Sequence, residues 1–233
     1  MYKGLKIKAP FFEIGPKAYL YGEEMLKLAQ VIDKTALKYD VDVIVTPQYT
    51  DIKLLADNTE RILVFAQHMD SLPVGRGLGS VLPEAVKAAG AVGVMLNHAE
   101  KPLTLEEVDK TIKRADEVGL GTIVCADTVE DVKAIAKMSP NLIVAEPTEL
   151  IGTGKTSDSN YVLDTIKTVN EINPDIMVLQ GAGISNGEDV YNTIKLGAQA
   201  TGSTSGIIKA ADPYAMVEEM LYNLRKAWDE LHK

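Results

Sequence analysis

Residues 122–145 read TIVCADTVEDVKAIAKMSPNLIVA, with two short apolar runs on either side of one amphipathic segment. The runs Thr122–Ala126 and Leu142–Ala145 are apolar on both faces, which is typical of strands buried in a parallel sheet. Between them, Asp127-Thr128 provides a polar N-cap for a helix expected over Val129–Lys137. A strand, a helix and a second strand within this length predict a right-handed βαβ unit.

The same alternation extends over the whole chain. Further strands are predicted at Phe11–Ile14, Val43–Thr46, Leu63–Ala66, Val92–Asn97, Ile176–Leu179 and Gln199–Ser203. Further helices are predicted at Glu23–Tyr39, Leu105–Val118, from Ser157-Asp158 to about Ile172, and from Asp212-Pro213 almost to the end. Eight strands with helical followers predict an α/β protein, a closed (β/α)8 barrel forming a single domain over residues 1–233. An open doubly wound sheet is the competing architecture, but no G-x-G-x-x-G turn follows the first predicted strand.

The composition is that of a soluble globular protein, and it argues against nucleic-acid and membrane partners. Of the 233 residues, 46% are hydrophobic and 24% are charged, as in ordinary soluble globular proteins. The net charge of −9 argues against a nucleic-acid partner, although a local pocket can still hold a small anion. The single cysteine, Cys125, indicates a reducing, cytoplasmic location. The start, MYKGLKIKAP, lacks an apolar signal segment, and no apolar run approaches the roughly 20 residues that span a bilayer, so no membrane partner is expected.

Two loops of small residues follow the last two predicted strands. They are Gly181–Ser185, which reads GAGIS, and Gly202–Gly206, which reads GSTSG. Barrels of this kind often bind phosphate with these two loops, because small residues let backbone N–H groups approach an anion. Glycine and serine also make ordinary turns, but their occurrence at both expected positions favours a phosphate site.

Glu146 directly follows the strand Leu142–Ala145 and begins a loop with the features of a lid. Pro147 fixes the backbone at one end, and Gly152-Thr153-Gly154 supplies pliable backbone at the other, around the apolar pair Leu150-Ile151. A lid of this kind excludes water when it closes and raises the basicity of a carboxylate beneath it. The sequence therefore predicts a mobile lid over Glu146.

Two more polar residues follow predicted strands at the same end of the barrel. His98 follows Val92–Asn97, and Lys17 is the cation placed to meet a phosphate or a developing oxyanion near the first strand. His68 and His98 are thirty residues apart without supporting cysteine or carboxylate spacing, so no metal site is expected.

Several of these segments resemble the triosephosphate isomerase family, in particular its compact archaeal-type branch. They are LNHAE at Leu96–Glu100, EPTELIGTGK at Glu146–Lys155, GAGIS at Gly181–Ser185, and Pro83–Gly93. The likeness covers essentially the whole chain in order, and the lid segment is its most specific part. The resemblance implies a TIM barrel.

The resemblance also implies an activity, the interconversion of glyceraldehyde 3-phosphate and dihydroxyacetone phosphate through an enediol(ate). Glu146 would be the base, and His98 a neutral electrophile, a pairing typical of the family. Lys17 would give electrostatic support, and Glu100 would orient neighbouring groups. The implied phosphate ligands are the backbone groups of Gly152, Gly183, Thr204 and Ser205. No metal or organic cofactor is implied.

Two positions depart from the family pattern. The family has Asn-x-Lys where this chain has Gly15-Pro16-Lys17, so the asparagine that touches a substrate oxygen is missing. A glycine at position 15 is expected to free volume, which keeps open an isomerase of another small sugar phosphate, such as a tetrose phosphate. A barrel that binds a phosphorylated metabolite without catalysis is the other alternative.

The second departure is Leu78, which replaces the family's usual threonine in the loop Gly75–Gly79. In the family this loop inserts into a partner subunit, so the resemblance implies a homodimer or a homotetramer. Leu72-Pro73-Val74 and Leu78 also make the loop apolar for a solvent-exposed segment, which supports a buried contact.

Overall fold

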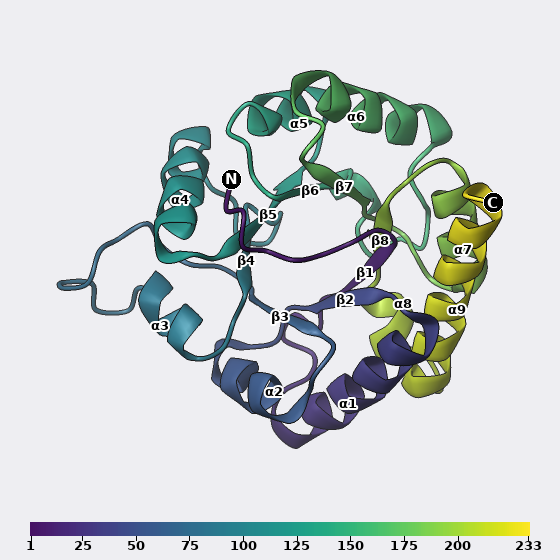
Figure 1. Ribbon diagram of the computed structural model, residues 1–233, viewed down its shortest axis with the longest axis horizontal. Coiled ribbons are helices and arrows are strands. Elements are labelled where there is room, and N and C mark those ends of the chain that lie inside the picture. The colour runs from purple at the N-terminus through teal and green to yellow at the C-terminus, as the bar shows by residue number, and fades with distance from the viewer.

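The computed structural model describes all 233 residues and has eight parallel strands in a closed barrel (Figure 1). The strands are β1 (Phe11–Ile14), β2 (Asp42–Val45), β3 (Leu63–Ala66), β4 (Gly93–Leu96), β5 (Gly121–Ala126), β6 (Leu142–Ala145), β7 (Met177–Gln180) and β8 (Ala200–Gly202). Each strand pairs with the next, and β1 pairs with β8, so no edge is left open. The predicted (β/α)8 barrel is therefore confirmed, and the open doubly wound sheet is wrong.

The helices form an outer ring around the barrel (Figure 1). They are α1 (Gly22–Tyr39), α2 (Ile52–Asn58), α3 (Pro83–Ala88), α4 (Leu105–Val118), α5 (Val129–Ala136), α6 (Ser159–Ile172), α7 (Gly187–Lys195), α8 (Ser205–Ile208) and α9 (Pro213–Leu231). Short 3-10 turns occur at Tyr49–Asp51 and Thr148–Leu150. The strands and helices predicted by residue range all form, with ends that differ by at most two residues.

Local sequence signals set several helix ends. At the start of α4, the Thr104 side chain accepts a hydrogen bond from the Glu107 N–H, and the Glu107 carboxylate accepts one in return from the Thr104 N–H. Gly119 ends this helix in the left-handed conformation, with φ of 76°, which glycine adopts without a steric cost. Thr128 and Asp131 make the same reciprocal cap on α5. These caps fix where each helix leaves the loop at the end of a strand.

Two apolar clusters pack against the strands, one between the barrel and its helices and one inside the barrel. Alternate strand residues point outward against the helices, as Phe12 and Ile14 do, or inward, as Phe11 does. By this alternation the next inward position on β1 is Glu13, an acid in an otherwise apolar strand. The N-terminal segment crosses one end of the barrel (Figure 1), where Leu5 and Ile7 pack against the inner cluster. The opposite end is left to the loops that follow the strands.

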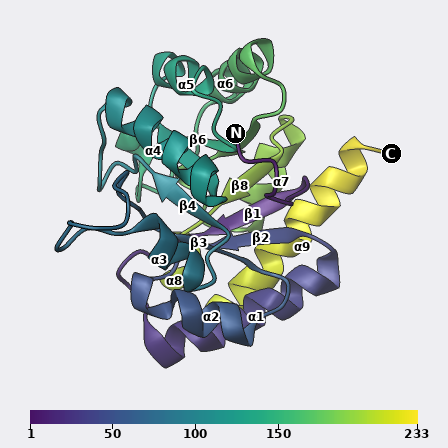
Figure 2. The same cartoon turned by 60° about the vertical axis from the view of Figure 1, so that its left-hand side comes forward.

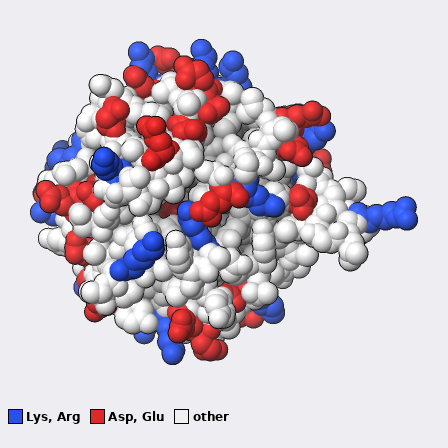
Figure 3. Space-filling view, turned by 180° about the vertical axis from the view of Figure 1, so that it is seen from behind, with Lys and Arg blue, Asp and Glu red and all other residues white.

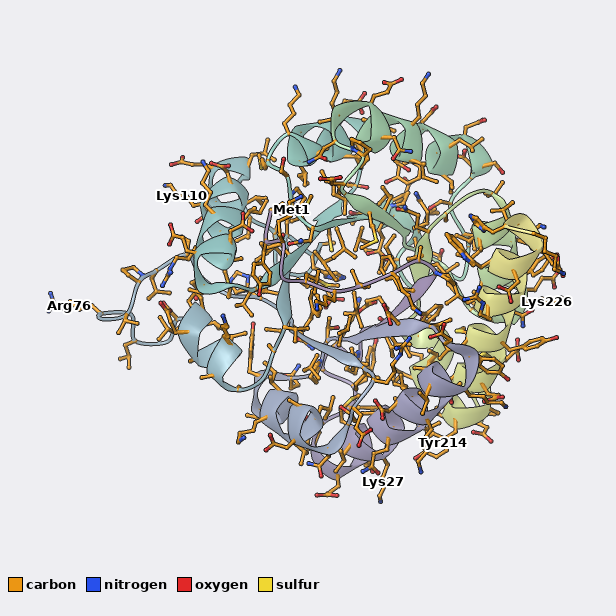
Figure 4. All side chains as sticks on the ribbon, in the orientation of Figure 1. Met1, Lys27, Arg76, Lys110, Tyr214 and Lys226 are labelled. Carbon is orange, nitrogen blue, oxygen red and sulfur yellow. The ribbon has the colours of Figure 1, made fainter.

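The loop between β3 and α3 projects away from the barrel in both ribbon views (Figures 1 and 2). Arg76 lies at its tip (Figure 4), and Val74 and Leu78 are exposed apolar residues on it. None of the helices combines the length and the apolar character needed to cross a membrane.

Candidate active site

A cavity of about 500 Å³ lies at the carboxyl ends of the strands. Figure 3 shows this face of the molecule, with acidic and basic side chains close together near its middle. The lining includes every site residue proposed from the sequence: Lys17, His98, Glu100, Glu146, Gly152, Gly183, Thr204 and Ser205. Residues from the five loops that follow β1, β4, β6, β7 and β8 therefore meet in one place, as a parallel barrel requires.

Glu146 lies directly after β6, and its backbone N–H donates to the Ala126 carbonyl at 2.9 Å. Its carboxylate oxygen Oε1 accepts a hydrogen bond from the Ala182 N–H at 3.0 Å. Burial raises the pKa of Glu146, while the Ala182 N–H and Lys17 lower it and Glu100 raises it. A carboxylate that is partly stripped of water is a stronger base than one in solution.

His98 follows β4, and its Nδ1 atom accepts a hydrogen bond from the Glu100 N–H at 3.1 Å. A ring nitrogen that accepts has no proton of its own, so the neutral ring carries its proton on Nε2. Burial lowers the pKa of His98, and the nearby Lys17 lowers it further, against a smaller opposite effect of Glu100. The imidazole is therefore neutral near pH 7 and able to donate from Nε2.

Lys17 is held in an unusual backbone conformation, with φ of 49°. Its carbonyl accepts hydrogen bonds from the side-chain amides of Gln48 at 2.7 Å and Gln67 at 2.9 Å. These two bonds compensate the cost of a left-handed non-glycine residue. The Lys17 Nζ atom donates to Glu100 Oε1 at 2.7 Å, which also lowers the pKa of Glu100.

The sequence analysis missed Gln48 and Gln67, although a signal was present. Both follow strands at the carboxyl end of the barrel, Gln67 immediately after β3 and Gln48 three residues after β2. Each lines the cavity, but both amides bind the backbone of Lys17. They position the cation in the site.

The loops after β6, β7 and β8 pack tightly against one another. A Cβ atom on Gly183, which has φ of 71°, would lie 1.9 Å from the Lys155 carbonyl oxygen. The Ser203 hydroxyl donates to the Ile184 carbonyl at 2.7 Å, joining the last two loops. Small residues are thus required here for the close approach of these loop backbones to one another.

The space beside Gly15 is occupied. A Cβ atom at this position would lie 2.9 Å from Glu13 Oε1, 3.2 Å from Thr46 Oγ1 and 3.4 Å from Thr204 Oγ1. A glycine here therefore leaves less free volume for a larger substrate than the missing side chain alone suggests. Three side-chain oxygen atoms fill the place where a residue-15 side chain would begin.

Glu13 is the main site residue that the sequence analysis missed. It is buried, it lines the cavity, and its Oε1 atom accepts a hydrogen bond from Thr46 Oγ1 at 3.1 Å. Burial raises the pKa of Glu13 to about 8, with smaller effects of Thr46, Glu146 and Lys17. A single acid in the strand FFEI was the available signal. No group of three or more His, Cys, Asp or Glu side chains in the structure is placed to hold a metal ion.

Known proteins of similar sequence identify the family of this chain. A family model described as triosephosphate isomerase matches residues 14–220. The chain belongs to the triosephosphate isomerase family. It is 42% identical over 211 residues to the triosephosphate isomerase of Methanobacterium bryantii, covering 88% of this chain and 93% of that protein. It is 39% identical over 227 residues to the triosephosphate isomerase of Sulfurisphaera tokodaii, covering 96% and 99%.

A crystal structure of the triosephosphate isomerase from Bartonella henselae has a TM-score of 0.75 with this chain, at 14% identity. It covers 95% of this chain and 99% of that protein, which supports the fold of a triosephosphate isomerase. The resemblance to the archaeal branch is confirmed, and membership of this family makes the protein an isomerase.

Proposed function

We propose that this protein interconverts glyceraldehyde 3-phosphate and dihydroxyacetone phosphate, with Glu146 as base and His98 as electrophile. The observation that carries the proposal is the convergence of Glu146, His98 and Lys17 on one cavity beside the small-residue loops after β7 and β8. A desolvated carboxylate, a neutral N–H donor and a cation are the groups that an aldose–ketose proton transfer needs.

In this mechanism, Glu146 removes a proton from the carbon next to the substrate carbonyl and later returns it to the neighbouring carbon. The electron pair left by the first step moves onto the carbonyl oxygen, giving an enediolate. His98 gives its Nε2 proton to this oxygen and takes up the proton of the neighbouring hydroxyl, whose oxygen becomes the new carbonyl when Glu146 returns its proton to carbon. The ammonium of Lys17 stabilises the negative charge on the enediolate. Glu100 is a positioning residue, because it pairs with Lys17 and its N–H fixes the His98 tautomer.

The substrate phosphate is held by backbone groups of the loops after β6, β7 and β8. The proposed ligands are Gly152, Gly183, Thr204 and Ser205, all in the cavity wall. Gly152 and Gly154 have φ of 74° and 73°, a conformation that suits hinge points in the lid. Closure of this lid over the phosphate excludes water and protects the enediolate from loss of phosphate.

A coupled assay in both directions, with purified protein and each triose phosphate, tests the proposal. We expect turnover of both trioses, and a kcat/KM for a tetrose phosphate at least about 100-fold lower, because oxygen atoms occupy the space beside Gly15. Preferred turnover of the tetrose would favour the isomerase of another sugar phosphate. A failure to turn over either sugar, with a phosphorylated compound raising the Tm, would favour the non-catalytic barrel.

We also propose that the protein is a homodimer or homotetramer joined through the loop around Gly75–Gly79. Leu78 is fully exposed in the single chain and Val74 is 70% exposed, so the projecting loop has apolar surface to bury. We place the protein in the cytoplasm, where its one buried cysteine, Cys125, needs no disulfide partner.

Light scattering on a sizing column checks the assembly. We expect a mass of two or four chains for the wild type, and dissociation for Leu78→Asp, which introduces a charge into the proposed contact. Leu37→Asp, at an exposed leucine on α1, is the matched control and should leave the mass unchanged. A monomeric wild type would contradict the proposed assembly.

A further inference from the structure

The carboxyl group of Glu13 lies between two glycines at the floor of the cavity. A Cβ atom on Gly15 would be 2.9 Å from its Oε1 atom, and a Cβ atom on Gly202 would be 3.1 Å from its Oε2 atom. Neither glycine covers the acid with a side chain, and Glu13 itself is part of the cavity wall. The carboxyl group therefore fills the space in which a longer residue at position 15 would begin.

Only one of the two Glu13 oxygen atoms is bound by the protein. The Thr46 hydroxyl donates to Oε1 at 3.1 Å and orients the group, and this is the only hydrogen bond that the Glu13 carboxyl group makes to the protein. No lysine, arginine or histidine forms an ion pair with Glu13. A buried acid without a cation favours its neutral form, which carries one O–H donor and retains acceptor capacity.

We propose that protonated Glu13 makes the polar contact to the substrate oxygen that the family's asparagine makes from position 15. A protonated acid and an amide each offer a donor and an acceptor. Glu13, the inward-pointing residue two positions before Gly15, can therefore bind the same substrate oxygen. Through this contact Glu13 favours the three-carbon substrate over other sugar phosphates, in a site that has no asparagine at position 15. This inference rests on the proposed triose phosphate isomerisation.

The contact depends on pH because ionised Glu13 cannot donate. Three titratable groups face Glu13: Lys17, which lowers its pKa, Glu146, which raises it, and the Cys125 thiol, whose own pKa is raised well above its usual value. With a Glu13 pKa of about 8, the O–H group is present at pH 7 and is lost as the pH rises through 8. An anion at position 13 would then repel both Glu146 and the enediolate.

The resulting pH profile of kcat/KM has two limbs. On the acid side, activity falls as Glu146 takes up its proton, at a pH above the ordinary range of a glutamate because its pKa is raised. On the alkaline side, activity falls as Glu13 loses its proton, near pH 8. Such limbs in kcat/KM report the groups of the free enzyme, since the triose phosphates themselves stay dianionic across the alkaline limb.

Three variants of the whole protein test the proposal. Glu13→Gln keeps a donor that does not ionise, so kcat/KM at pH 7 should stay within about threefold and the fall near pH 8 should disappear. Glu13→Ala removes the contact, and kcat/KM should drop about 10- to 100-fold. In Glu13→Ala/Gly15→Asn the new amide enters the vacated space and should recover about tenfold.

Cys125→Ala is the control for the alkaline limb, because the wild-type Cys125 thiol is a second group near Glu13 that could lose a proton. In this variant the fall near pH 8 should persist. Circular dichroism shows whether each variant is folded; the Gln variant decides the question if the Ala variant is not. An unchanged alkaline limb in Glu13→Gln, or full activity in Glu13→Ala, overturns the role of Glu13 and leaves the proposed function standing. A wild type inactive on trioses overturns both.

Discussion

Glu146→Gln is expected to lower kcat on both triose phosphates by about 10³-fold or more, because an amide cannot accept the proton that the mechanism moves between carbons. The amide oxygen can still accept the hydrogen bond that the Ala182 N–H donates to Glu146 Oε1 at 3.0 Å, so the loop keeps its position. KM should therefore change only a few-fold. Steady-state kinetics in the coupled assay, with the amount of enzyme raised for the variant, give both numbers.

The matched control is Glu149→Gln, which removes an exposed carboxylate from the same loop. Glu149 does not line the cavity, and we expect kcat within about twofold of the wild type. A loss smaller than tenfold in Glu146→Gln would show that another carboxylate removes the proton, and Glu100 and Glu13 are the other two in the cavity wall.

Lys17→Met is expected to lower kcat/KM by about 10²- to 10³-fold, because it removes from the cavity wall the cation that stabilises the enediolate in the proposed mechanism. Methionine keeps an unbranched chain of similar length, and the two glutamine amides still bind the backbone carbonyl of residue 17. Kinetics should show a lower kcat, whereas loss of a purely structural contact would act mainly on the Tm.

A second readout separates these possibilities. Lys17 is one of the causes that lower the pKa of His98, so the His98 pKa should move back toward its ordinary value in Lys17→Met. Proton NMR of the imidazole across a pH titration measures this shift. Lys27→Met, at an exposed residue on α1 (Figure 4), is the control and should alter neither value. An unshifted His98 with normal kcat/KM would remove Lys17 from the mechanism.

The fold was accessible from the sequence because each βα unit carries its own local signals. The apolar run at Leu142–Ala145 and the cap at Asp127-Thr128 both mark element ends that the structure reproduces. Some strand ends differ from the predicted ones, because the end of a strand depends on its hydrogen bonds to neighbouring strands. Local composition does not encode these hydrogen bonds. Asp42, for example, joins β2 because it pairs with Phe11 on the neighbouring strand β1.

The site was accessible only in part. Glu146 and His98 could be found because they follow strands at the end of the barrel where parallel strands place functional groups. The position of Glu13 relative to Gly15 and Gly202 depends instead on the registers of β1 with β2 and β8, which bring three separate segments within about 3 Å. For the same reason the sequence suggested open space at Gly15, where the structure has oxygen atoms.

The pairing of β1 with β8 also affects how the protein is made. It joins residues 11–13 to residues 200–202, so a ribosome synthesises almost the whole chain before the ring can close. Until then, the first and the most recently made strands have unpaired backbone groups, which strands of neighbouring chains can bind. The nascent chain, and not the finished enzyme, is the form most exposed to aggregation. A lower expression level, which reduces the concentration of incomplete chains, should therefore raise the fraction of soluble, folded protein.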